Sequence, residues 1–93
     1  MPAAEGFFRI LHTRIRPSRQ ESAQFAVTLA KTSRVKLKAY DLTGRLAATV
    51  ADESLAAGSY KLAWDGGDAG SGVYMVYFEA GDLRGRGKVV VIR

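Results

Sequence analysis

Two acidic residues, Asp65 and Asp68, lie in the glycine-rich segment "DGGDAGSG". Acidic side chains could bind a metal ion, and a glycine-rich loop could bind a phosphate group. A phosphate-binding P-loop carries Gly-Lys and then Ser or Thr, and this segment contains no lysine. A dinucleotide-binding glycine loop leads into a helix, whereas the residues that follow, "VYMVYF", have the composition of a strand. Neither nucleotide-binding motif therefore fits.

A calcium ion takes six to eight oxygen ligands, and two carboxylates three positions apart are too few to supply them. We predict that the segment binds no metal and no other cofactor. Asp65 is expected to accept hydrogen bonds from the backbone of its own turn, as aspartate commonly does. The glycines would then let two strands join without a steric clash.

The sequence offers no set of catalytic side chains. It contains no cysteine and one histidine, His12, so disulfides, thiolate metal sites and a histidine cluster are excluded, and a Ser-His triad is hard to assemble. No apolar run approaches the roughly 18 residues that cross a membrane. We expect no catalytic residues, no enzyme activity and no membrane span.

The net charge of +5 is concentrated in the first half of the chain. Residues 1–46 carry nine Lys or Arg against three acids, a balance of +6, and residues 47–93 carry five against six, a balance of −1. A basic half of this kind binds anionic partners, such as nucleic acid or lipopolysaccharide, or forms a solvated face that keeps a small domain soluble.

Apolar residues recur with a period of two along most of the chain, which predicts half-buried strands. Seven strands separated by turn residues indicate an all-β, antiparallel β-sandwich over residues 7–93, after a linker remnant at 1–6. The expected strands are 7–15, 23–30, 34–41, 44–51, 59–64, 72–80 and 84–93. The expected core consists of Phe25, Val27, Leu29, Val35, Leu37, Leu46, Val50, Leu62, Trp64, Tyr74, Val76, Phe78, Val89 and Val91.

Two further features have competing interpretations. Trp64 shares its apolar face with Tyr60 and Leu62, which favours a core position over a sugar-binding platform. Tyr40 and Tyr77 are the best candidates for exposed sugar-binding rings. The segment "RGRGK" at residues 84–88 is similar to arginine-glycine segments that bind RNA, but a flexible entry into a strand explains it as well. We expect no nucleic-acid partner.

Residues 16–93 contain an ordered set of short motifs: Tyr40-Asp41, Gly44-Arg45, Gly58, Trp64-Asp65-Gly66, Gly72-Val73-Tyr74 and the closing segment Lys88 to Arg93. In this order the motifs resemble the C-terminal sorting domain of type IX secretion cargo. They resemble equally the immunoglobulin-like domain of flagellar hook-capping proteins. The family usually opens with Pro-Asn-Pro, of which this chain keeps Pro17 alone.

The resemblance implies an immunoglobulin-like fold and a non-catalytic label attached to a larger secreted protein. Such labels cross the periplasm, are read by the outer-membrane secretion machinery, and leave the cargo on the bacterial cell surface, joined to anionic lipopolysaccharide. This copy is expected to be a monomer. The segment expected to be read, through an open strand edge, is Lys88, Val89, Val90, Val91, Ile92 and Arg93. The alternatives are a carbohydrate- or polyanion-binding accessory module and a passive structural spacer.

Alternation also predicts one strongly basic face. If Tyr74, Val76 and Phe78 point inward, Met75, Tyr77 and Glu79 point outward between two rows of cations. This face would have positive potential and attract anionic surfaces such as lipopolysaccharide, weakly and in a salt-dependent way. The expected rows are Arg34, Lys36 and Lys38 on one side, and Arg84, Arg86 and Lys88 on the other.

Overall fold

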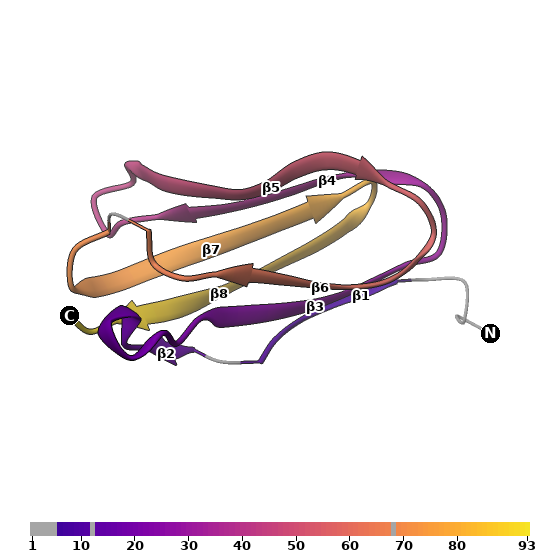
Figure 1. Ribbon diagram of the computed structural model, residues 1–93. Coiled ribbons are helices and arrows are strands. Elements are labelled where there is room, and N and C mark those ends of the chain that lie inside the picture. Colours follow the sequence, from indigo (N-terminus) through magenta and orange to yellow (C-terminus); the bar gives the residue numbers. More distant parts are fainter. Residues whose placement is uncertain (1–5, 12, 68) are drawn as a thin grey trace.

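The computed structural model describes residues 6–11, 13–67 and 69–93 (Figure 1). Most of the linker expected at 1–6 lies outside these residues, as do His12 and Asp68. Nearly every described element is a strand, in agreement with the period of two in the sequence. The strands are β1 (Phe7–Ile10), β2 (Arg14–Ile15), β3 (Ala23–Leu29), β4 (Ser33–Tyr40), β5 (Leu46–Leu55), β6 (Gly58–Trp64), β7 (Gly72–Ala80) and β8 (Leu83–Val91), with one 3₁₀ turn at Pro17–Arg19.

The strands form two sheets that pack face to face, as Figure 1 shows. One sheet has the order β1-β3-β6, and the other has the order β2-β8-β7-β4-β5. The chain is therefore an all-β sandwich, as predicted, and its strands are distributed between the sheets in an immunoglobulin-like arrangement. The strand β7 lies in the middle of the larger sheet, as its sequence indicated, but only one of its faces is buried: Tyr74, Val76, Phe78 and Ala80 point into the core, and Tyr77 and Glu79 on the other face are exposed.

The segment predicted as one strand at 7–15 forms two short strands that belong to different sheets. β1 pairs antiparallel with β3, and β2 pairs with β8. The transition is abrupt: the amide of Leu11 donates to Gln24 of β3, whereas the carbonyl of Thr13 already accepts from Val90 of β8. The β2–β8 pairing is parallel, so the prediction of a purely antiparallel sandwich was wrong at this edge.

The core between the sheets contains most of the residues predicted for it, and no polar side chain is buried among the described residues. Ile15 and four alanines are buried there without having been predicted. Val50 and Leu62 are only partly buried and pack against the core from its margin. The prediction for Leu46 was wrong, because 53% of its surface is exposed.

The error at Leu46 has a clear cause in the pairing of β4 with β5. The register shifts twice, between Leu37 and Lys38 and again between Ala39 and Tyr40, so β5 contains an extra residue at each bulge. Each extra residue reverses the side on which the following side chains point. The inward positions of β5 therefore include Ala48 and Ala51, and Leu46 points outward with its partner Tyr40.

Candidate functional site

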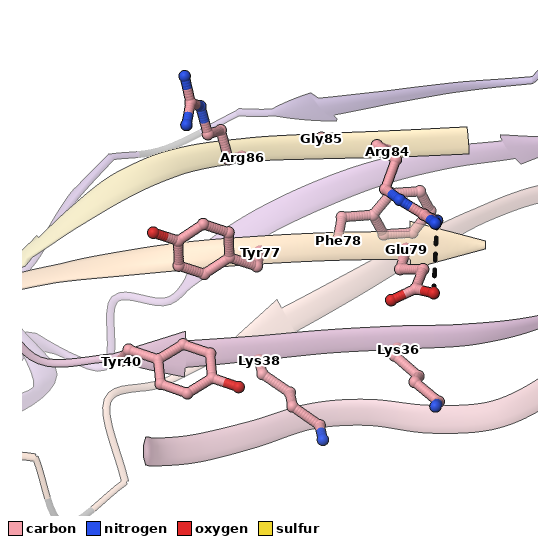
Figure 2. A pocket seen from close by; sticks show the side chains of 9 residues that line it. All are labelled: Lys36, Lys38, Tyr40, Tyr77, Phe78, Glu79, Arg84, Gly85 and Arg86. Carbon is pink, nitrogen blue, oxygen red and sulfur yellow. Dashed lines mark ion pairs between the residues drawn. The ribbon is translucent and has the colours of Figure 1, made fainter. Parts of the chain in front are cut away.

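The outer face of the larger sheet carries the two cationic rows that the alternation predicted. Direct cross-strand partners place Tyr77 of β7 between Lys38 of β4 and Arg86 of β8. One step along the sheet, Glu79 lies in the same way between Lys36 and Arg84. Figure 2 shows these side chains together on the solvent side of the sheet, with Phe78 on the opposite side.

Carboxylates neutralise only part of this face. The Nη1 atom of Arg84 lies 3.4 Å from Glu79, and the guanidinium of Arg34 lies 2.8 Å from Asp52 of β5. The Asp52 contact could not be predicted from the sequence, because it depends on the register in which β5 pairs with β4. Among the described residues, no ion pair involves Lys36, Lys38, Arg86 or Lys88. The six predicted cations are therefore met by two carboxylates, and the face keeps a positive balance.

An aromatic pair lies within the cationic rows. The rings of Tyr40 and Tyr77 meet edge to face, with centroids 5.6 Å apart. Tyr77 is 45% exposed, whereas Tyr40 is half-buried. Both rings line a hollow that is open to solvent and also includes Lys36, Lys38 and Arg86 (Figure 2). The aromatic rings form its floor, and the cations lie on both sides, as in a trough.

The segment "RGRGK" has a structural explanation in the packing of β1 onto β8. Its arginines point outward, and Gly85 and Gly87 point inward, where Phe8 and Ile10 of β1 fill the space above them. A Cβ atom on Gly85 would lie 2.5 Å from the Phe8 ring. That ring stacks on Phe78 with centroids 4.4 Å apart. The glycines thus allow close packing between the two sheets, and this part of the segment is an ordered strand.

In the glycine-rich segment, the described residues 65–67 and 69–71 form a turn region, as predicted. Asp65 accepts a hydrogen bond of 2.9 Å from the amide of Gly67, two residues on. The ring of Trp64 meets the ring of Tyr74 edge to face at 5.6 Å, and Trp64 is buried as expected. The hydroxyl of Tyr74 donates to the carbonyl of Gly70 at 2.7 Å. This last contact is a tyrosine corner, a known brace of sandwich folds.

Arg93, which follows β8, forms hydrogen bonds with this turn region. Its side chain donates to the carbonyls of Gly67 and Ala69, and its amide donates to the hydroxyl of Ser71 at 2.8 Å. Gly66 lies at the same place, with a φ of 89° and with Pro17 and Arg93 beside it. The predicted motif positions Trp64-Asp65-Gly66, Gly72, Tyr74 and Arg93 are therefore brought together at one end of the sandwich.

The expectation of an open edge along the last strand was wrong at its end. β2 pairs with Val90 and Val91, and the amide of Ile92 donates to Ile15 at 2.9 Å, so that this edge is already used. Val89 and Val91 are buried in the core. Of the predicted recognition residues, Lys88 and Arg93 are exposed, and Val90 and Ile92 are half-buried. Where β2 pairs, at residues 90–92, only side chains are left for a partner to contact.

The predicted hairpin motif at Tyr40-Asp41 and Gly44-Arg45 forms the turn between β4 and β5. The carboxylate of Asp41 accepts from the hydroxyl of Thr43 at 2.6 Å and from the amides of Thr43 and Arg45 at 2.9 and 3.0 Å. These hydrogen bonds hold the pKa of Asp41 below its ordinary value, and the bond from the Thr43 hydroxyl has the largest effect. Gly44 has a φ of 90°, which a residue with a side chain rarely adopts.

The comparison with known proteins adds no identity. No protein-family model matches the sequence, and no curated protein matches it. Within the described residues, no three His, Cys, Asp or Glu side chains lie close enough to hold a metal ion. No helix in the described part of the chain has the length and apolar character needed to cross a membrane.

Proposed function

We propose that this domain is a non-catalytic sorting and attachment module of a larger secreted protein, recognised by the type IX secretion machinery. Its place of action is the bacterial cell surface, reached through the periplasm. The proposal rests on the ordered motifs that resemble the sorting family. The observation that best supports it is that these motifs have connected structural roles instead of being scattered over the surface.

Two groups of contacts make this connection. The Tyr-Asp and Gly-Arg motifs meet in the β4–β5 turn, where Asp41 accepts three hydrogen bonds. The Trp-Asp-Gly and Gly-Val-Tyr motifs meet the closing Arg93 at one end of the sandwich. These residues fix the backbone shape at each place, and a fixed backbone is what a recognition signal carried by exposed side chains requires.

Within this proposal, the machinery reads the closing segment through side chains. Lys88 projects from the outer face beside Met75, and Arg93 lies at the end of the sandwich. Val89 and Val91 contribute to folding instead. Deleting residues 89–93 would therefore remove core residues and unfold the domain, so that a failure of export would not identify the recognised residues.

The test is a fusion of residues 1–93 to the end of a periplasmic reporter in a type IX-competent host, with surface exposure measured by protease accessibility on intact cells. We expect the reporter to reach the surface, and to remain in the periplasm in a host that lacks the translocon. Lys88→Glu is expected to reduce surface exposure severalfold. Lys61→Glu, an equal charge change at an exposed position of β6, is expected to leave surface exposure of the reporter unchanged.

The outcomes separate the two parts of the proposal. A folded full-length fusion that stays in the periplasm of the competent host contradicts the sorting function, and would favour a structural spacer or a binding module. Surface exposure that is equal for Lys88→Glu and the parent keeps the sorting function and contradicts recognition at Lys88. Circular dichroism of each purified fusion domain establishes that it is folded.

A further inference from the structure

We propose that the trough on the outer face of the larger sheet, with its tyrosine rings and the cations on either side of them, binds a carboxylated polysaccharide. The trough has Tyr77 and Tyr40 as its floor and Lys36, Lys38 and Arg86 beside them. The ion pair of Glu79 and Arg84 also lines it. This binding activity is separate from the sorting function. It depends only on the arrangement of one face of the larger sheet.

The central unit of the trough is a single cross-strand row. Lys38, Tyr77 and Arg86 are direct partners on three neighbouring strands, so the ring has one cation on each side. Figure 2 shows that the Lys38 and Arg86 side chains extend away from the ring in opposite directions. The space above Tyr77 is therefore left open to a ligand, with a cation on either side of it.

The chemistry of this row matches an acidic sugar chain. An exposed tyrosine presents an apolar ring face, on which the C–H groups of a sugar ring can pack, and a hydroxyl that stays in contact with water. Carboxylates on neighbouring sugars would meet Lys38 and Arg86, neither of which has an ion-pair partner among the described residues. The edge contact with Tyr40 fixes the position of the Tyr77 ring in advance, which lowers the entropy cost of binding.

Other polyanions fit this face less well. Single-stranded nucleic acid binds by stacking successive bases on several aromatic rings, whereas Tyr77 is the one ring of this trough that is more than a third exposed. A peptide that adds a strand needs an open edge, and the strands that carry Tyr40, Lys38 and Tyr77, β4 and β7, both have partners on two sides. A polysaccharide needs neither a row of rings nor a free edge.

The opposite sheet contains a natural control for charge. Arg9, Ala26 and Lys61 form a row across β1, β3 and β6 in which two exposed cations also lie on either side of a central residue. That central residue is alanine and not tyrosine. The double variants Lys38→Gln/Arg86→Gln and Arg9→Gln/Lys61→Gln thus remove the same charges from equivalent rows.

The test measures binding of the full domain to polygalacturonate, neutral dextran and a single-stranded oligonucleotide, at low and at physiological salt. We expect weak binding to polygalacturonate that declines with salt, because exposed charges are screened within about 8 Å at physiological ionic strength. Lys38→Gln/Arg86→Gln is expected to reduce affinity about tenfold. Tyr77→Ala is expected to reduce it about fivefold. Arg9→Gln/Lys61→Gln is expected to have less than a twofold effect.

Four results would overturn the proposal. Equal losses in the two double variants would mean that only net charge attracts the polymer. Full affinity in Tyr77→Ala would remove the ring from the site. Tighter binding of the oligonucleotide would assign the face to nucleic acid, and salt-independent binding of dextran would assign it to neutral sugars. Thermal unfolding of each variant, expected to match the parent within a few degrees, excludes misfolding as the cause.

Discussion

Single hydroxyl groups brace this fold at the places where strands begin. Tyr74 donates to Gly70 at 2.7 Å, and Tyr60 donates to Ala56 at 2.6 Å, each four residues upstream in the chain. The two contacts are alike in geometry but differ in burial, since Tyr74 is 8% exposed and packs on Trp64, and Tyr60 is half-buried. The same interaction should therefore contribute differently at the two positions.

The substitution Tyr74→Phe is predicted to lower the free energy of unfolding by about 1 kcal/mol, because the part-buried hydrogen bond from the Tyr74 hydroxyl to the Gly70 carbonyl is lost. Tyr60→Phe removes the equivalent hydroxyl at a wetter position, where water can replace it, and should cost less. Denaturant titration of both variants measures the difference. An equal or larger cost at Tyr60 would contradict the assignment of Tyr74 as the main brace.

At the scale of elements, the alternation of arginine and glycine in β8 matches the packing of β1. The inward glycines leave room for Phe8, whose ring stacks between Phe25 and Phe78 with centroids 5.9 and 4.4 Å away. A glycine inside a strand ordinarily weakens it, and here close packing between the sheets offsets that loss.

The substitution Gly85→Ala is predicted to lower the free energy of unfolding by about 1–3 kcal/mol, since the new methyl group would overlap the Phe8 ring. Gly70→Ala is the matched control, because a Cβ atom there meets nothing within 4 Å. Combining Gly85→Ala with Phe8→Leu should recover part of the loss. Chemical denaturation of the four proteins provides the test, and a neutral Gly85→Ala would contradict the packing argument.

The β4–β5 turn is predicted to make stability depend on acid pH through Asp41. Hydrogen bonds to its carboxylate hold the folded-state pKa below the unfolded value of about 3.9. A group with a lowered folded pKa stabilises the protein above its unfolded pKa, and this contribution is lost as pH falls through the folded value. The Asp41 contribution should therefore be constant above about pH 5 and decline below about pH 4.

Melting temperatures of the parent and Asp41→Asn between pH 3 and pH 7 test this prediction. The gap between the two proteins should be constant at the upper end and narrow below about pH 4. Asp82→Asn, in the β7–β8 turn, controls for the loss of one negative charge. A gap that widens as the pH falls would contradict the sign of the effect.

At the scale of the whole molecule, the end of the chain helps to hold the two sheets together. The segment from β6 to β7 crosses from the smaller sheet to the larger one, and Arg93, after the end of β8, donates to the carbonyls of Gly67 and Ala69 within it. One side chain thus links the larger sheet to the crossing segment. The contact is exposed, so we expect it to stabilise the crossing segment more than the domain as a whole.

The substitution Arg93→Ala is predicted to speed amide hydrogen exchange in residues 66–71 and to lower the free energy of unfolding by about 1 kcal/mol. Arg86→Ala removes an equal charge from the centre of the outer face without touching this segment, and should leave its exchange unchanged. Exchange measured by mass spectrometry distinguishes the two variants. Unchanged exchange in Arg93→Ala would show that the segment is held by its own turns.

Much of this structure follows from local pattern. Side chains alternate across any strand, so the inward set of β3 and the outward cations of β4 and β8 were predictable without knowledge of their partners. The turn chemistry of Asp41, Gly44 and Asp65 is likewise local, because each contact spans at most four residues. The sandwich, the central place of β7 and the face that holds Tyr77 follow from these patterns.

Features that depend on contacts between residues far apart in the chain could be known only from the tertiary structure. The bulge between Ala48 and Leu46 turned Leu46 outward, and a change of sheet after Leu11 let β2 cover the end of β8. The pairing of Asp52 with Arg34 and the packing of Phe8 over Gly85 follow from the same long-range choices. Register and sheet membership depend on how all the strands pack together in the core. The period of two in the sequence is compatible with several registers and therefore does not distinguish among them.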